Sequence, residues 1–362
     1  MNTSPEVLLS VRDLRVSFGA VEAVRGLSFD VHAGQVLAVV GESGAGKSLT
    51  ARALLGMPPR RATVTGSVRL GPPEPGPQEL GPPEAGPLEL GAQELVGAPR
   101  SVRAALWGRR LALVPQDALS ALSPVHPVAD QLAAAVRSVD GVSRGAARAR
   151  AVAALEEVGI TADQARRHPH EFSGGMRQRA VIAMALLHSP ALVVADEPTT
   201  AQDPQTRRQI LDLLTRRTRA AGAALVLITH DVPTVHEHAD RVLVMYAGRL
   251  AEEGPAAEVF ARPHAPYTAG LLASAPRPRE GRGEPYDRPR RTRTLLPTIP
   301  GTPPAPTALP PGCAFAPRCP LAAAPRCHTE RPEPQTHHGR TVACHHWRAL
   351  PDDPATLFTE PT

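Results

Sequence analysis

Aromatic residues and long hydrophobic runs are both scarce in this sequence. Trp, Tyr and Phe make up 3% of its 362 residues, and no apolar run approaches the roughly 20 residues that a bilayer-spanning helix needs. The N-terminus shows no charged and then apolar leader, and no stretch shows a heptad repeat. These absences argue against a membrane-spanning or coiled-coil protein, and we expect a cytoplasmic chain with reduced thiols.

Proline and arginine are abundant instead. The chain has 41 prolines and a net charge of +5. Its length of 362 residues suggests one large domain with an appendage, or two domains, and its 42% hydrophobic content suffices for a core. The arginines gather late in the chain among prolines and glycines, and we interpret this stretch as a solvated linker. A surface for anionic lipid or nucleic acid is the alternative, and we expect no nucleic-acid partner.

A phosphate-binding loop is predicted at Gly41–Ser48, where the sequence reads GESGAGKS. It follows the apolar run 36–40 and precedes a helical pattern at 49–55, which is the strand, loop and helix context that this motif requires. Glycines let backbone N–H groups curl around a polyphosphate, and the helix N-terminus adds further donors. We expect Lys47 to reach the outer phosphates, and the Ser48 hydroxyl to ligate Mg²⁺.

Two adjacent carboxylates end another apolar strand, predicted at 191–195. Asp196 suits Mg²⁺, directly or through water, and Glu197 suits the polarising of an attacking water molecule. Ligands bind at the carboxyl ends of strands in open α/β sheets, so a solvated acidic turn is the weaker interpretation. Gln116 lies near the end of a strand predicted at 111–117, where it could contact a metal or water.

Three further features are weak when each is taken alone. The Ser-Gly-Gly sequence at Ser173 precedes an apolar helix at 180–187 and would form a second anion site from backbone N–H groups. His230 ends the apolar strand 223–229 and could bond a γ-phosphate, although a strand-end histidine is more often structural. Phe18 could stack on an adenine ring or lie in the core, and the chemistry favours neither.

Residues 71–95 contain two and a half copies of an acidic, Pro-rich repeat. This composition cannot build a solenoid core. We therefore predict a low-complexity, mobile surface insertion that does not affect catalysis.

Together, in order and over residues 8–260, these motifs resemble the ATP-binding subunits of ABC transporters. The resemblance implies nucleotide binding by Phe18, Gly41, Glu42, Ser43, Gly44, Ala45, Gly46, Lys47, Ser48 and Leu49. It implies catalysis by Lys47, Glu197 and His230, and magnesium binding by Ser48, Gln116 and Asp196. It also implies a signature motif, which contacts ATP held by a second cassette, at Ser173, Gly174, Gly175 and Met176, and a D-loop residue at Asp203.

Three stretches, 168–179, 182–186 and 195–201, are similar to the oligopeptide and dipeptide importer branch of that family. The tail carries its His-Pro-Tyr-Thr element as His264-Ala-Pro-Tyr-Thr268, with one residue inserted. The resemblance implies an ATP hydrolase that uses ATP and Mg²⁺ and energises import of di- or oligopeptides from the cytoplasmic face of the membrane. The implied partners are two permease subunits, a second ATP-binding subunit, identical or homologous, and an extracytoplasmic solute-binding protein.

Two other functions remain open on the sequence. An importer of the same branch could carry nickel or another small solute, because none of the residues above touches the solute. A soluble ABC-type ATPase without a transport role is the second alternative, although such proteins usually carry two cassettes or a long coiled coil.

All four cysteines lie in the tail, at Cys313, Cys319, Cys327 and Cys344. Four cysteines so close together in a cytosolic chain suggest a metal or cluster site rather than disulfides. Thiolates can hold Zn²⁺ or an iron–sulfur cluster, and the family resemblance favours [4Fe–4S]. Four ordinary reduced cysteines are the alternative, and His345 or His346 could replace a ligand.

The predicted fold class is α/β, an ABC-type P-loop ATPase domain. We expect a mixed sheet core, a helical subdomain and an N-terminal antiparallel β subdomain. The ATPase domain is predicted at 1–262, and a Pro/Arg-rich, Cys-containing extension of the oligopeptide-importer type at 263–362.

Overall fold

The computed structural model describes residues 6–71, 92–200, 202–275 and 297–358. They form two compact units, of which the first contains the chain up to Leu37 and from Lys47 to Ile228. The second contains residues 38–46 and those from Thr229 onward. The phosphate loop is therefore divided, with residues 41–46 in the second unit and Lys47 and Ser48 in the first. The predicted domain boundary at 262 stays a prediction.

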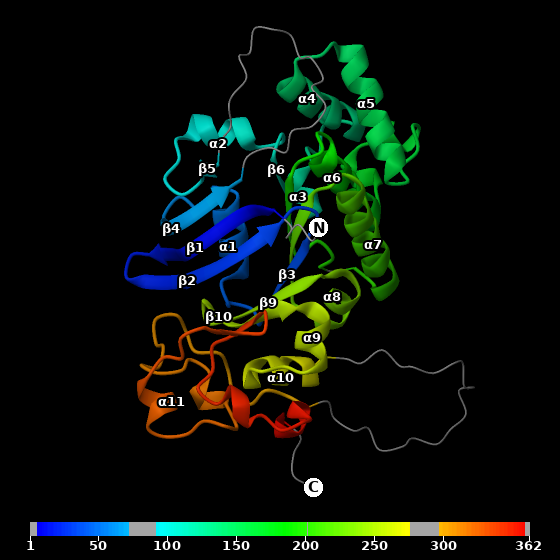
Figure 1. Cartoon of the computed structure of the whole chain (residues 1–362). Coiled ribbons are helices and arrows are strands. Elements are labelled where there is room, and N and C mark those ends of the chain that lie inside the picture. The colour runs from blue at the N-terminus through cyan, green and yellow to red at the C-terminus, as the bar shows by residue number, and fades with distance from the viewer. Residues whose placement is uncertain (1–5, 72–91, 201, 276–296, 359–362) are drawn as a thin grey trace, which may run out of the picture. The chain divides into compact units, whose positions relative to one another are not determined.

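An antiparallel sheet opens the first unit, as predicted (Figure 1). Its order is β2-β1-β4-β5, with β1 at Val7–Phe18, β2 at Val21–His32, β4 at Thr63–Leu70 and β5 at Gln93–Glu94. Alternate residues of β1 are fully buried on each side of Asp13, namely Leu9 and Val11 before it and Leu14 and Val16 after it, as expected for a strand with one face in the core. Helix α1, at Lys47–Leu54, packs against β1, β2 and β4.

The end of the predicted insertion belongs to this sheet. Residues 72–91 of the repeat lie outside the described residues, but Gln93 and Glu94 pair antiparallel with Leu70 and Arg69. The predicted low-complexity segment is therefore too long at its C-terminal end. The backbone pairing outweighs the repeat-like composition there.

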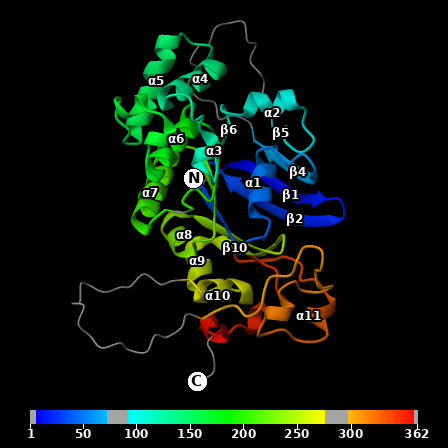
Figure 2. The same cartoon turned by 180° about the vertical axis from the view of Figure 1, so that it is seen from behind.

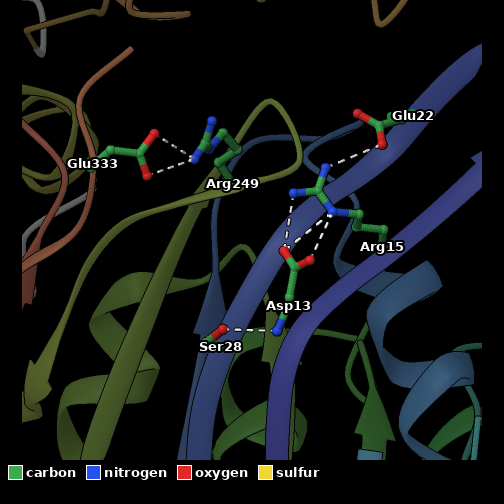
Figure 3. Close-up of polar contacts among 6 residues, drawn as sticks. All are labelled: Asp13, Arg15, Glu22, Ser28, Arg249 and Glu333. Atoms are coloured by element: carbon green, nitrogen blue, oxygen red, sulfur yellow. Dashed lines mark hydrogen bonds and ion pairs between the residues drawn. The ribbon is translucent and has the colours of Figure 1, made fainter. Parts of the chain in front are cut away.

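A polar network accompanies a break in the register between β1 and β2 (Figure 3). Asp13 has φ of +45°, and its N–H donates to Ser28 Oγ at 2.9 Å. Its carboxylate accepts hydrogen bonds from Arg15, which also donates to Glu22 at 3.3 Å. Because these groups are partly exposed, the network shapes the bulge more than it stabilises the fold.

Helices α4 (Val128–Asp140) and α5 (Arg144–Glu157) pack on one another and lie side by side in both views (Figures 1 and 2). Gly141, with φ of +66°, ends α4 in the left-handed conformation that favours glycine. Ser143 Oγ accepts from the N–H of Ala146 and caps α5. The short helices α2 (Arg100–Leu106) and α3 (Ala118–Ala121) also belong to this unit.

Three buried parallel strands carry the acidic site. They are β6 (Leu111–Val114), β7 (Leu192–Asp196) and β8 (Ala224–Thr229), in the order β8-β7-β6. Strand β6 is shorter than predicted because Asp117 caps α3, with its Oδ1 accepting from the N–H of Leu119 at 2.9 Å. Helices α6 (Gly174–Leu186) and α7 (Pro204–Ala220) pack on one another.

The second unit is built on the antiparallel order β11-β12-β10-β9. Strands β9 (Arg241–Tyr246) and β10 (Arg249–Pro255) form a hairpin that turns at 247–248, and β11 (Gln335–His337) and β12 (Arg340–Val342) follow late in the chain. The helices are α8 (Val232–His238), α9 (Ala256–Ala261), α10 (Pro266–Ala273) and α11 (Arg326–Thr329). Residues 38 and 40 of β3 (Val36–Val40) share one core with Tyr246, Tyr267, Phe315 and Phe358.

None of the helices in the described ranges is both long and apolar enough to cross a bilayer. The longest, α7, has 17 residues and carries arginines near both ends.

Candidate functional site

Ser48 and Asp196 meet in the first unit. The Ser48 hydroxyl donates to Asp196 Oδ1 at 2.9 Å, which joins the start of α1 to the end of β7. The adjacent Lys47 is 6% exposed. Hydroxyl and carboxylate oxygens are the ligands that Mg²⁺ prefers, so these two side chains fit the ion that the motif implies.

The Asp196 carboxyl lies in an environment that disfavours its charge. Burial is the main cause that raises its pKa, and the neighbouring Glu197 carboxylate adds to the effect. The hydrogen bond from Ser48 opposes this shift. A bound cation would stabilise the charged form of this carboxylate.

Glu197 is held by three polar groups of the first unit. Its N–H donates to the carbonyl of Ile228 at 2.9 Å, and its backbone has φ of +46°. Oε2 accepts from Thr200 Oγ1 at 3.0 Å and from Gln116 Nε2 at 3.4 Å. Thr200, to which the sequence assigned no role, thus helps Gln116 to hold the predicted water-polarising carboxylate, and it makes the shorter of the two bonds.

The predicted signature forms the start of α6. Ser173 Oγ accepts from the N–H of Met176 at 3.3 Å, so this serine is the helix cap. A Cβ on Gly174 would lie 3.1 Å from the Gln202 side chain, and one on Gly175 would lie 3.1 Å from Thr206. The glycines therefore let this turn approach the segment that contains the predicted D-loop.

Asp203 caps α7. Its Oδ1 accepts from the N–H groups of Gln205 and Thr206, at 3.1 and 3.0 Å. Hydrogen bonds from Thr206 are the main reason that its pKa lies below the usual value. Asp203 thus stabilises the start of α7, and its D-loop role stays a prediction.

Gly41 opens the part of the loop that lies in the second unit. Its φ is +154°, and a Cβ there would lie 2.2 Å from the carbonyl oxygen of Met245 on β9. Only glycine fits that approach. Further along, the N–H of Gly248 donates to the carbonyl of Ala45 at 3.1 Å, so the β9–β10 hairpin supports the loop.

Glu42 is bound by two residues of the tail that the sequence did not single out for this site. Its backbone N–H donates to the Tyr267 hydroxyl at 2.9 Å, and its carboxylate accepts from Arg318. Burial raises the pKa of Tyr267 well above its ordinary value. Burial opposes the charge on Arg318, but hydrogen bonds to Glu42 and Tyr246 outweigh it and raise the pKa of the guanidinium.

The remaining predicted site residues lie on the elements expected. Phe18 is half-buried at the end of β1, Leu49 is half-buried in α1, and His230 is exposed after β8. Their roles toward nucleotide stay predictions.

The four cysteines are free thiols that influence one another. Burial is the main cause that raises the pKa of Cys319 to about 11 and of Cys344 to about 12, and neighbouring thiols add to both shifts. Among the described residues, however, no three His, Cys, Asp or Glu side chains form a group that could hold a metal ion. As they lie, the thiols do not fit the predicted zinc or [4Fe–4S] site, and we derive no chemistry from it.

The two histidines proposed as substitute ligands differ in their contacts. Nε2 of His345 lies 2.9 Å from the carbonyl oxygen of Glu330. The backbone N–H of His346 donates to Cys344 Sγ at 3.3 Å, and its ring Nε2 is buried without a hydrogen-bond partner among the described residues. Neither contact brings an imidazole nitrogen to the thiols.

Two sequence families match the chain. The family described as ABC transporter matches residues 24–200, and the oligopeptide/dipeptide transporter C-terminal region matches residues 251–327. The second match covers part of the cysteine-containing tail.

Curated relatives share about two-fifths of their residues with the chain. The dipeptide transport ATP-binding protein DppD of Bacillus subtilis is 40% identical, with 87% of each chain covered. OppD of Escherichia coli, an oligopeptide transport ATP-binding protein, is 39% identical over 94% of this chain and 93% of its own. OppD of Mycobacterium tuberculosis is 43% identical over 90% of this chain, which spans 49%, about half, of that relative.

Solved structures share the fold of the cassette. A dimeric structure of the bacterial ABC transporter cassette MJ0796 has a TM-score of 0.57 at 19% identity and covers 68% of this chain and 98% of its own. A post-hydrolysis dimer of the same cassette has a TM-score of 0.56 at 20% identity, with the same coverage. These likenesses confirm the predicted fold class.

Proposed function

The chain belongs to the ATP-binding proteins of ABC transporters, in the branch with the oligopeptide/dipeptide C-terminal region, and we propose that it hydrolyses ATP to energise import of di- or oligopeptides. The Ser48–Asp196 hydrogen bond carries the catalytic part of the proposal, because it joins the phosphate-loop helix to the acidic strand end. Relatives that share both the cassette and the tail support the peptide substrate.

Each residue of the site has a distinct task in this proposal. Lys47 and the loop N–H groups hold the phosphates. Ser48, Gln116 and Asp196 would hold Mg²⁺, which when bound neutralises phosphate charge. Glu197, kept in place by Thr200, orients the attacking water and takes up its proton.

His230 and Phe18 complete the proposed nucleotide site. We assign the His230 imidazole to a hydrogen bond with the γ-phosphate and the Phe18 ring to stacking on the adenine. Both assignments follow the family pattern, and single substitutions with alanine test them through KM for ATP.

The chain carries one phosphate loop and one signature, so we propose that it works with a second ATP-binding subunit. The signature residues Ser173–Met176 would contact ATP held by that subunit. Two permease subunits and an extracytoplasmic solute-binding protein complete the proposed importer, with this chain on the cytoplasmic face of the membrane.

The test combines hydrolysis with association. Tagged wild type and Glu197→Gln are purified from native membranes, and ATPase activity and co-purifying proteins are measured. Permease subunits in both samples, with activity lost only in the variant, would support the proposal. Glu156→Gln, an exposed glutamate near the end of α5, is the matched control and should behave as wild type.

Two results would contradict the proposal. Full activity in Glu197→Gln would remove the assigned catalytic carboxylate. A protein that recovers no permease would favour a soluble ATPase, and uptake of labelled nickel instead of labelled peptide by the intact system would change the solute class.

A further inference from the structure

Arg318 of the tail forms a bidentate ion pair with Glu42, the second residue of the phosphate loop. Nη1 donates to Oε2 at 2.7 Å, and Nη2 donates to Oε1 at 3.0 Å. The Arg318 side chain is 5% exposed, and that of Glu42 is 25% exposed. A pair with two parallel bonds and little solvent is held in one geometry more firmly than a surface pair.

The guanidinium is fixed on its other sides as well. Its Nε donates to the carbonyl of Pro300 at 2.7 Å, and Nη1 donates to the Tyr246 hydroxyl at 3.2 Å. Tyr246 packs on Tyr267 and Phe315, with ring centroids 4.5 and 5.3 Å away. Arg318 is therefore presented to the loop by an aromatic cluster made by β9, α10 and the tail.

Tyr267 binds the backbone of the same loop residue. Its hydroxyl accepts from the N–H of Glu42 at 2.9 Å, and the side chain is almost fully buried, at 2% exposure. Backbone and carboxylate of Glu42 are thus both held by residues beyond 262. The tail thus contacts the phosphate loop at Glu42.

A carboxylate in a phosphate-binding loop is electrostatically unfavourable. ATP brings several negative charges to the loop, and an unpaired Glu42 would repel them across a partly desolvated site. Pairing with a buried arginine cancels that charge and holds the carboxylate in a fixed place. The loop N–H groups can then donate hydrogen bonds to the phosphate oxygens.

We propose that Arg318 is a positioning residue for the nucleotide, which neutralises Glu42 and so permits the triphosphate to bind. This inference rests on the proposed function, because it takes ATP to be the ligand of the loop. It gives the tail a role in nucleotide affinity.

The test is an electrostatic rescue in the full-length chain. Affinities for ATP, ADP and adenosine are measured in EDTA, so that ATP is not hydrolysed. Arg318→Gln should weaken ATP binding about tenfold, ADP binding less, and adenosine binding not at all, because the repulsion grows with phosphate charge. The double variant with Glu42→Gln should recover most of the lost ATP affinity, although it has lost the same ion pair.

A kinetic readout separates positioning from a folding defect. In Arg318→Gln, KM for ATP should rise about tenfold while kcat at saturating ATP stays within about twofold of wild type. Higher salt should reduce the difference between the variant and wild type, since screening weakens the repulsion.

Two matched variants serve as controls. Arg249→Gln breaks another ion pair of the same unit, with Glu333 at 3.4 Å (Figure 3), and should leave nucleotide affinity unchanged. Tyr267→Phe removes the hydrogen bond to the Glu42 N–H without changing a charge. Any change in affinity should therefore be the same for ATP and for adenosine.

The outcomes separate the two proposals. Wild type that fails to bind ATP would overturn both, whereas wild type that binds ATP unless Lys47 is changed to alanine would leave the proposed function standing. A double variant no better than Arg318→Gln, or equal losses for ATP and adenosine, would overturn the inference alone. If Arg318→Gln does not fold, Glu42→Gln decides: it should bind ATP two- to fivefold more tightly, and weaker binding would overturn the inference.

Discussion

The Ser48 hydroxyl and Asp196 Oδ1 lie 2.9 Å apart, although 148 positions separate the two residues in the chain. The contact places an alcohol and a carboxylate at one point of the first unit. Burial raises the pKa of the Asp196 carboxyl, so the folded chain without nucleotide holds a destabilised charge there. This is the usual trade between stability and function at a cation site.

Asp196→Asn should therefore stabilise the nucleotide-free chain while it abolishes ATP hydrolysis. The pKa of the Asp196 carboxyl is higher in the folded chain than in the unfolded chain, so ionised Asp196 destabilises the fold. This destabilisation is full above the folded pKa and absent below the unfolded pKa, where the group is protonated in both states. At pH 7 we expect the variant to gain about 0.5–2 kcal/mol. Thermal unfolding from pH 4 to 8 checks this: the gain should shrink toward acid pH, and a variant less stable than wild type at pH 7 would contradict it.

Thr200→Val should lower kcat about tenfold with KM for ATP nearly unchanged, because the hydroxyl that holds Glu197 Oε2 is lost. Steady-state ATPase kinetics measure both constants. Thr200→Ser keeps the hydroxyl and should restore most of the rate. If the serine variant is as slow as the valine variant, the hydrogen bond is not what positions Glu197.

Gly41→Ala should destabilise the chain by about 3 kcal/mol or more and abolish ATP binding, because its Cβ would lie 2.2 Å from the Met245 carbonyl oxygen. Gly44→Ala is the comparison within the same loop. Gly44 also has a positive φ, of +81°, but a Cβ there has no atom within 4 Å. Denaturant unfolding of both variants separates the clash from backbone strain, and equal losses would show that strain alone matters.

Local patterns in the sequence predicted most of the first unit. The loop at 41–48 and the acids at 196–197 were recognisable because strand, turn and helix signals adjoin them in the chain. The strand predicted at 111–117 was too long because a side-chain cap at Asp117 outweighs the extended pattern. That competition depends on one hydrogen bond, which a hydrophobic pattern does not report.

The contacts of the tail could not be predicted in the same way. Arg318 lies 276 positions from Glu42, and Tyr267 lies 225 positions from it. Arg318 lies in the Cys-rich stretch beyond the Arg/Pro-rich linker, and nothing local in the sequence indicates a contact with the phosphate loop. A tyrosine and a phenylalanine in so aromatic-poor a chain were the available signal, since rare large rings concentrate in cores.

Within the second unit, a buried ion pair ties the tail to strand β10. Glu252 on β10 is fully buried, and its carboxylate accepts from Arg340 on β12 and from the N–H groups of His264 and Ala265. Burial is the main cause that raises the pKa of Glu252. These bonds join the strand of the cassette, the start of α10 and the late hairpin.

Arg340→Met should destabilise the chain by about 3–5 kcal/mol, because it leaves the Glu252 carboxylate buried without its cationic partner. Arg326→Met is the matched control, since Arg326 pairs with Glu330 on an exposed surface, and it should cost no more than about 1 kcal/mol. Denaturant unfolding at pH 7 measures both. Adding Glu252→Gln to Arg340→Met removes the uncompensated charge and should recover part of the loss; if the double variant is less stable than Arg340→Met, hydrogen bonds to the His264 and Ala265 N–H groups matter more than the charge pair.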